Sequence, residues 1–375
     1  MHTILWTIFI ISLTLILYNY FLYPALVYIF SKIKPINHKQ YEKESEYPSI
    51  CLVIPAISDA KELKKKIQNT LKLYYPKGKL LILAISDKNN EPAQELLREY
   101  KKHGIITFSK RGMAPGYQAL NIGAKLAKTT LIVFSDTNNE FNDLALMKLA
   151  RHFKDPRIAA VSGVRVTLGG KSRQTSTGDN LYWKYETMIK VAESKLGSTT
   201  AAAGEIMAIR RELYTPVDLN YINFDAAITF KLIKKGYRVI VDEEAISLTH
   251  ALTDMKSAFS ERTTRAKGSF QTLFSEFGYL FPPRNWFAFT FVSHKCIRWF
   301  VPFLLLTVFI VPFFMLEDMA MLTLTILQLG FYLFGLAGWL LRNQMTLPGY
   351  MNLITYFTIM NMAMFAGFFR YLIRR

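Results

Sequence analysis

The chain has 375 residues, of which 51% are hydrophobic, and its formal net charge is +18. Apolar residues are concentrated at the two ends and most charges lie between about residues 32 and 298, as in a membrane protein with a basic domain beside anionic lipid. No nucleic-acid-binding motif accompanies the charge, which argues against nucleic acid as a partner. Cys51 and Cys296 are too few for a disulfide framework or a cysteine metal cluster.

Residues 1–31 are predicted to form an N-terminal transmembrane helix. The run from Ile4 to Phe30 has no charged residue and is too long for the apolar part of a signal peptide. Lys32 and Lys34 follow it, so the positive-inside rule places the next domain in the cytosol. We therefore expect an integral protein of the inner or plasma membrane, with a polar linker at 32–48.

From residue 49 to residue 250 the pattern alternates between short apolar strands and helices. Strands are predicted at 49–55, 79–85, 104–108 and 130–134, and helices at 60–73, 91–103 and 116–128. This alternation predicts an α/β domain with a mostly parallel, Rossmann-like sheet covered on both faces. Ligands of such sheets bind at the carboxyl ends of the strands.

Carboxylates follow three of these strands, at Asp59, Asp87 and Asp136. A single acidic residue after a strand is common in loops and helix caps, but three at successive strand ends favour a ligand site. A nucleotide diphosphate needs an acceptor for its base and a hard oxygen ligand for a divalent cation.

The C-terminal third is predicted to meet the membrane. Residues 251–298 combine cationic and aromatic side chains, which favours amphipathic interfacial helices, with an ordinary soluble helix as the alternative. Residues 299–375 contain apolar runs at 299–316, 319–341 and 350–370. Glu317 and Asp318 fit an outside turn and Arg342 an inside one, but a third crossing would put Arg370, Arg374 and Arg375 outside. The last run is therefore a spanning, re-entrant or interfacial segment.

The order of these segments resembles the membrane-attached family 2 glycosyltransferases, a group that includes polysaccharide synthases and ceramide-glucosyltransferase-like enzymes. The resemblance covers about residues 49–300 and implies a GT-A catalytic domain at 49–250. It implies inverting, metal-dependent transfer from a nucleotide diphosphate sugar, with a UDP-sugar expected, to a lipid or polysaccharide. Pro55, Ala56 and Asp59 match the nucleotide-binding stretch, and Asp87 matches the aspartate that contacts the base.

The resemblance also implies the metal and donor ligands. Asp136 and Asn138 stand at the Asp-x-Asp element that binds Mg²⁺ or Mn²⁺, with asparagine replacing the second acid. His250 stands where relatives place a residue that reaches the metal or the diphosphate, although a surface histidine is an equal alternative. Arg111 is the one cation available in the loop where relatives carry a nucleotide-binding lysine. Gly204 begins a strand expected beneath the donor sugar, where a Cβ would be excluded.

The remaining matches concern the acceptor and the chemistry. Trp183 and Glu186 lie in a segment that resembles the acceptor side. Asp225 fills the position of the catalytic base, with Phe224 in place of a preceding acid, and the alternative for Asp225 is a helix N-cap. Arg262 and Arg265 match the Arg-rich element that stabilises the departing diphosphate, and the alternative for them is membrane-surface charge. Ala266 stands where relatives carry a tryptophan.

Two other functions stay open at this stage. One is processive polysaccharide synthesis with export, which would require a homo-oligomer or an export partner to complete a pore. The other is a non-catalytic, membrane-tethered relative that binds a nucleotide sugar, which the departures at Asn138, Phe224 and the Arg111 loop favour. The sequence does not identify the sugar, the acceptor or the linkage.

Overall fold

The computed structural model describes residues 2–56, 59–113, 117–168, 173–250, 255–341 and 348–373. The chain divides into two compact units. The sheet unit comprises Ile33–Leu168 and Glu186–His250, and the helical unit comprises Met1–Lys32, Gly169–Tyr185 and Ala251–Arg375.

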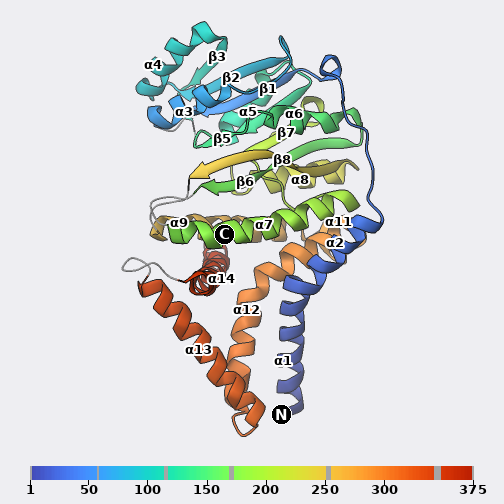
Figure 1. The fold of residues 1–375 in the computed structure, drawn as a ribbon, viewed down its shortest axis with the longest axis vertical. Helices are drawn as coiled ribbons and strands as arrows, with labels where there is room; N and C mark the ends of the chain where they lie inside the picture. Colours follow the sequence, from blue (N-terminus) through green and yellow to red (C-terminus); the bar gives the residue numbers. More distant parts are fainter. Residues whose placement is uncertain are drawn as a thin grey trace. The chain divides into compact units, whose positions relative to one another are not determined.

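The sheet unit is built on a mixed sheet with the strand order β3-β2-β1-β4-β7-β6-β8-β5 (Figure 1). Its strands are β1 (Ile50–Ala56), β2 (Leu80–Asp87), β3 (Ile105–Lys110), β4 (Leu131–Ser135), β5 (Asn139–Phe141), β6 (Ile158–Leu168), β7 (Ile206–Arg210) and β8 (Arg238–His250). The first four strands pair in parallel, β6 and β8 are also parallel, and β7 and β5 join their neighbours antiparallel. The predicted, mostly parallel sheet is therefore confirmed.

Helices cover both faces of this sheet. They are α3 (Ala60–Thr70), α4 (Glu91–Tyr100), α5 (Tyr117–Leu126), α6 (Ala145–Ala150), α8 (Phe224–Lys234) and the second half of α7 (Arg173–Leu196). Along β1, Leu52 faces a core shared with α3, α4 and α6, whereas Val53 faces a core shared with α5 and α8. The alternation of side chains along a strand thus explains why every residue of β1 is buried.

The segment predicted as a linker lies along the sheet unit. It contains one short 3₁₀ turn, Glu44–Glu46, but its backbone is tied down: Ile36 N–H donates to the Lys195 carbonyl at 2.7 Å, and Tyr41 N–H to the Arg151 carbonyl at 2.8 Å. A ring nitrogen of His38 lies 2.6 Å from one of His152. His152 in turn bonds the buried Asp242 carboxylate at 2.8 Å.

Among the residues that the structure describes, the helical unit has four stretches long and apolar enough to cross a membrane: His2–Ile33, Trp286–Phe314, Met319–Leu341 and Gly349–Ile373. They comprise α1 (His2–Leu17), η1 (Tyr18–Leu22), α2 (Tyr23–Ile33), α11 (Trp286–Phe291), η6 (Val292–Cys296), α12 (Ile297–Ile310), η7 (Val311–Phe314), α13 (Met319–Leu341) and α14 (Gly349–Ile373). These stretches indicate that the protein associates with a membrane.

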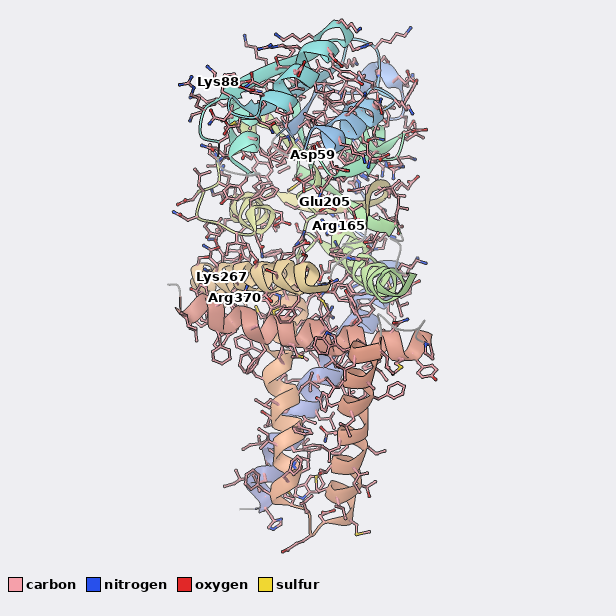
Figure 2. The ribbon with its side chains drawn as sticks, turned by 90° about the vertical axis from the view of Figure 1, so that its left-hand side faces the viewer. Asp59, Lys88, Arg165, Glu205, Lys267 and Arg370 are labelled. Atoms are coloured by element: carbon pink, nitrogen blue, oxygen red, sulfur yellow. The ribbon has the colours of Figure 1, made fainter. Side chains whose placement is uncertain are left out.

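The last of these helices runs in a different direction from the others. Figure 1 shows α1, α12 and α13 side-on but α14 end-on, and Figure 2 shows α14 lying across the ends of its neighbours. It packs against α9 (Met255–Ser275) through Gly367, where an added Cβ would lie 2.4 Å from Ala266 Cβ. Small residues permit this close approach of the two backbones. This contact leaves no room at position 266 for a side chain as large as tryptophan.

A buried polar cluster joins the N-terminal helix to the later helices of this unit. Asn19 is fully buried in the π-helical turn η1 and donates to the carbonyls of Ser293, at 2.6 Å, and His294, at 3.1 Å, in the π-helical turn η6. Arg298 Nε donates to Asn19 Oδ1 at 2.8 Å, and the guanidinium group stacks on the Tyr20 ring at 4.9 Å.

Candidate functional site

The carboxyl ends of β1, β2 and β4 meet at one edge of the sheet unit. Ala56 pairs with Ser86 across β1 and β2, and Val53 pairs with Phe134 across β1 and β4. The predicted residues Pro55 and Ala56 are buried at the end of β1, and the Thr137 hydroxyl donates to the Pro55 carbonyl. Asp59 caps α3 by accepting from Lys61 N–H at 3.3 Å.

Asp87 fixes the loop that follows β3. One carboxylate oxygen accepts from Asn89 N–H and the other from Met113 N–H, both at 2.8 Å. These backbone hydrogen bonds hold the pKa of Asp87 below its usual value, because they stabilise the charged form. Arg111 lies exposed in the bend that precedes Met113. Asp87 therefore stays negatively charged, and its hydrogen bond to Met113 N–H holds the backbone of the loop that carries Arg111.

The turn from Asp136 to Asn139 alternates between exposed and buried side chains. Asp136 and Asn138 are exposed, whereas Thr137 and Asn139 are buried at 3% and 1% exposure. The two residues predicted as metal ligands thus share the open side of the turn. A small hollow beside it is lined by Glu62, Lys65, Lys66, Thr137, Asn138, Asn139, Glu140, Leu168 and Leu248.

The oxygen atoms at this turn suit a hard cation. A carboxylate at Asp136 and an amide oxygen at Asn138 are the donor types that Mg²⁺ accepts, with waters and substrate phosphates completing its shell. Among the described residues no group of three or more His, Cys, Asp or Glu side chains forms a complete metal site. The antiparallel pairing of Asn139 with Thr249 puts the backbone of His250 beside that of Asn138. The His250 side chain lies outside the described part of the structure.

Gly204 precedes β7 and contacts the start of α8. A Cβ at this position would lie 2.4 Å from Phe224 Cζ, and the Phe224 ring stacks on Tyr117 at 6.3 Å between centroids. The glycine was expected to leave space for a donor sugar. The atom that a Cβ at this position would meet belongs instead to the Phe224 ring. The glycine is required by this contact whether or not a sugar also lies there.

Asp225 is the second residue of α8. Asn223 occupies the N-cap position, so the N-cap alternative for Asp225 is wrong. The half-buried Asp225 carboxylate accepts from Ala226 N–H at 2.8 Å, and the first turn of a helix stabilises negative charge. Ser135 pairs with Ile206 across β4 and β7, so Asp136 follows β4 beside the turn at Gly204 and Glu205. The contact between Gly204 and Phe224 then brings the start of α8 to the same edge.

An ion pair lies next to Gly204. Arg165 of β6 bonds the Glu205 carboxylate through two guanidinium nitrogens, and Figure 2 shows the two side chains together. Both are largely buried, with 18% and 9% of the side chains exposed. Sequence reasoning did not single out this pair, which fixes the turn before β7.

The predicted acceptor residues lie on α7, one turn apart. Trp183 belongs to the helical unit and packs edge-to-face on Tyr182 at 5.6 Å, whereas Glu186 belongs to the sheet unit and is 2% exposed. The arginines predicted to bind phosphate lie on α9 of the helical unit. Arg262 donates to the Tyr356 hydroxyl at 3.1 Å, and the half-exposed Arg265 pairs with Glu261 at 2.8 Å. The roles of these four residues stay predictions.

Sequence reasoning missed Lys66. It lies in the helix predicted at 60–73, and its side chain is fully buried and bonded to Asn139 at 2.8 Å. The signal was present in its spacing, because Lys66 shares the apolar helical stripe of Leu63, Ile67 and Thr70, all of which are buried.

Comparison with known sequences identifies relatives of part of this chain. Residues 48–271 match the sequence model of the family described as "Glycosyltransferase like family 2". The chain is 22% identical over 254 residues to the poly-beta-1,6-N-acetyl-D-glucosamine synthase of Staphylococcus aureus (strain COL), covering 64% of this chain but only 60% of that synthase. It is 24% identical over 277 residues to the "Probable glycosyltransferase YdaM" of Bacillus subtilis (strain 168), covering 70% of this chain and 66% of that protein.

A solved structure is similar in fold. The mannosyltransferase PcManGT from Pyrobaculum calidifontis, solved in complex with GDP-Man and Mn²⁺, aligns over 97% of this chain and 99% of its own, with a TM-score of 0.68 at 17% identity. At this identity the similarity concerns the fold alone, and it confirms the predicted GT-A-like class.

Proposed function

The chain belongs to glycosyltransferase-like family 2, and from this premise we propose that it transfers a sugar, with inversion, from a nucleotide diphosphate donor to an acceptor at a membrane surface. The observation that carries the proposal is the shared sheet edge at which Asp87, the Asp136–Asn138 turn and the first turn of α8 meet. Inverting transfer needs one base, one donor site and stabilisation of the leaving diphosphate.

In this mechanism the end of β1, with Pro55, Ala56 and Asp59, and the end of β2, with Asp87, hold the nucleotide. Asp136 and Asn138 would hold Mg²⁺ or Mn²⁺, which supplies positive charge to the leaving diphosphate, with His250 and Arg111 as further donor ligands. Mn²⁺ accompanies GDP-Man in the structure of the Pyrobaculum calidifontis mannosyltransferase, which supports the choice of cation.

Asp225 is the proposed general base. Its carboxylate would accept the proton of the acceptor hydroxyl while that oxygen attacks the anomeric carbon and the bond to the diphosphate breaks. Arg262 and Arg265 would offset charge on the leaving group, and Trp183 and Glu186 would line the acceptor side. A UDP-sugar is the expected donor, and the likeness to the staphylococcal synthase supports a polysaccharide as one acceptor class.

We further propose that α14 lies along the membrane surface and that three helical stretches cross the membrane. The direction of α14, which runs across the ends of α12 and α13, supports this arrangement (Figure 2). Lys267 of α9 and Arg370 of α14 would then lie beside anionic headgroups, as Lys32 at the end of α2 would. The positive charge stays on the cytosolic side, as the positive-inside rule requires, and the sheet unit is cytosolic.

The test is to incubate the detergent-purified protein with a panel of radiolabelled nucleotide sugars, with membrane lipids as acceptors and with Mn²⁺ or Mg²⁺. Release of nucleoside diphosphate identifies the donor, and product length on a gel separates single transfer from processive synthesis. We expect Asp225→Asn to lower kcat by at least about 100-fold. Asp218→Asn, an exposed aspartate in the loop before α8, is the matched control and should transfer as the wild type does.

Two results would contradict the proposal. Equal diphosphate release by wild type and Asp225→Asn would remove Asp225 from the mechanism. A wild-type protein that binds a nucleotide sugar but transfers nothing to any acceptor would favour the non-catalytic alternative.

A further inference from the structure

Lys66 is a fully buried lysine in the sheet unit. It lies on α3 between side chains that pack into the core, whereas Lys64 on the same helix is exposed. Removing an ammonium group from water costs several kcal/mol unless the group is well paired. A buried lysine is therefore retained at a cost in stability, and its contacts indicate what it does.

Those contacts lead directly to the turn that carries Asp136 and Asn138. Lys66 Nζ donates to Asn139 Oδ1 at 2.8 Å and lies 3.8 Å from the centroid of the Phe141 ring. Burial lowers the pKa of Lys66 to about 7, and the neighbouring carboxylates of Asp136 and Glu140 oppose this shift by favouring the charged form.

Asn139 extends this contact to two further elements. Its Nδ2 donates to the Glu205 carbonyl and to the Ser247 hydroxyl, both at 2.9 Å. One side chain of 1% exposure thus joins α3, the turn before β7 and strand β8. Every hydrogen-bonding atom of the Asn139 amide is used, since both N–H groups donate and the oxygen accepts.

The three joined elements carry the proposed donor site. Asp136 and Asn138 lie in the turn just before Asn139, and Gly204 lies just before Glu205. Strand β8 continues from Ser247 to its last residue, His250. We propose that Lys66 is a positioning residue that, through Asn139, holds the Asp136–Asn138 turn in register with the Gly204 turn and the end of β8. The proposal rests on the function proposed above, since it gives Lys66 a role in binding the cation and diphosphate of the donor.

The first experiment compares Lys66→Met with Lys64→Met in the full-length protein. Both substitutions remove one positive charge from α3, but only the first removes the bond to Asn139. The probes are GDP-mannose and UDP-N-acetylglucosamine with Mn²⁺, and binding is measured by calorimetry at a temperature where circular dichroism shows each variant folded. We expect Lys66→Met to raise the donor Kd by about 10–100-fold, as loss of a residue that orients metal ligands does, with Lys64→Met unchanged.

A second pair of variants separates positioning from general stability. Lys66→Gln keeps an N–H donor toward Asn139 and should retain most of the donor affinity. In an Asn139→Leu background, Lys66→Met should add no more than about twofold, because the path through Asn139 is already broken. In steady-state kinetics the KM for the donor should rise more than the KM for the acceptor. Ser247→Ala, a milder change at the same network, provides a folded variant if Lys66→Met does not fold, and should weaken donor binding in the same direction.

The outcomes distinguish the two proposals. A wild-type protein that binds neither probe, nor any other nucleotide sugar of the panel, overturns the proposed function and the role of Lys66 with it. A wild type that binds, together with a folded Lys66→Met variant of equal donor affinity, overturns the positioning role alone. Equal losses in Lys66→Gln and Lys66→Met, or an undiminished effect of Lys66→Met in the Asn139→Leu background, overturn the hydrogen-bond path.

Discussion

Replacing Gly204 with alanine tests the packing that positions the start of α8. The new Cβ would lie 2.4 Å from Phe224 Cζ and 3.0 Å from both Cε atoms, whereas nonbonded carbon atoms prefer about 3.5–4.0 Å. The ring must therefore move by about 1 Å. Its stacking on Tyr117 restricts that movement, so the strain is shared with α8.

Overpacking of this kind costs about 1–3 kcal/mol. For a domain of 150–250 residues that corresponds to a fall of about 2–12 °C in the apparent melting temperature. Near-ultraviolet circular dichroism in detergent, at one fixed scan rate, measures this fall. Because Phe224 precedes Asp225, the same displacement should lower kcat even at temperatures where Gly204→Ala is folded.

A double-mutant cycle makes the reasoning refutable. In a Phe224→Ala background the ring is absent, so Gly204→Ala should cost less than about 0.5 kcal/mol. An alanine variant that melts as the wild type does would contradict the contact between Gly204 and Phe224. A cost that persists without the ring would show that strain arises elsewhere, and the link to Asp225 would be lost.

Three further predictions concern other parts of the molecule. Burial and the neighbouring His152 lower the pKa of His38 from 6.5 to about 4; the folded state thus binds fewer protons, and stability should be full above pH 6.5 and fall as the pH drops toward 4, measured as the apparent melting temperature. Asn19→Leu leaves Arg298 without its main acceptor and should reduce stability by about 3–5 kcal/mol, seen as loss of monodisperse protein in detergent. A cysteine at Ile373 should react with an impermeant maleimide from the cytosolic side only.

Each of these has its own control. His38→Gln should flatten the fall in melting temperature between pH 6.5 and 4, and an unchanged slope would place the titrating group elsewhere. The double variant Asn19→Leu with Arg298→Met should be less damaging than Asn19→Leu alone. A cysteine at Met319, whose exposure is 74%, should react from the outside; labelling of both cysteines from the outside would show that α14 spans the membrane. Cys51 and Cys296 are buried and give little background.

The early strands and helices could be predicted because their local signals agree with their tertiary positions. The expected strands at 49–55 and 130–134 lie within about two residues of β1 and β4, since buried parallel strands are continuous apolar runs. Strand β5 could not be predicted from such a run. It has three residues, two of them polar, and is defined by its pairing with β8 more than 100 positions away.

The direction of α14 stayed open between a spanning, a re-entrant and an interfacial segment for a different reason. Its composition satisfies the criteria of a membrane span, and hydropathy records how apolar a helix is without recording its direction. The contact between Gly367 and Ala266 that holds α14 against α9 joins residues about a hundred positions apart. The burial of Lys66 was hidden for a similar reason. Four of the seven residues 60–66 are lysines, which indicates a solvated face. Only the position of Lys66 on the apolar side of the helix distinguishes it from the other three.

The π-helical turns η1 and η6 are joined by the hydrogen bonds of Asn19. Because of them, the number of residues in each helix is as important for this contact as the types of the residues. Deleting one residue from Val292–Cys296 would allow ordinary α-helical hydrogen bonding in this turn. It would rotate α11 by about 100° relative to α12 and shorten the stretch Trp286–Phe314 by about 1.5 Å. The carbonyl groups of Ser293 and His294 would then be used within their own helix and lost to Asn19, a partner 274 and 275 positions away. Single-residue insertions and deletions at these two turns should accordingly be tolerated far less well than conservative replacements.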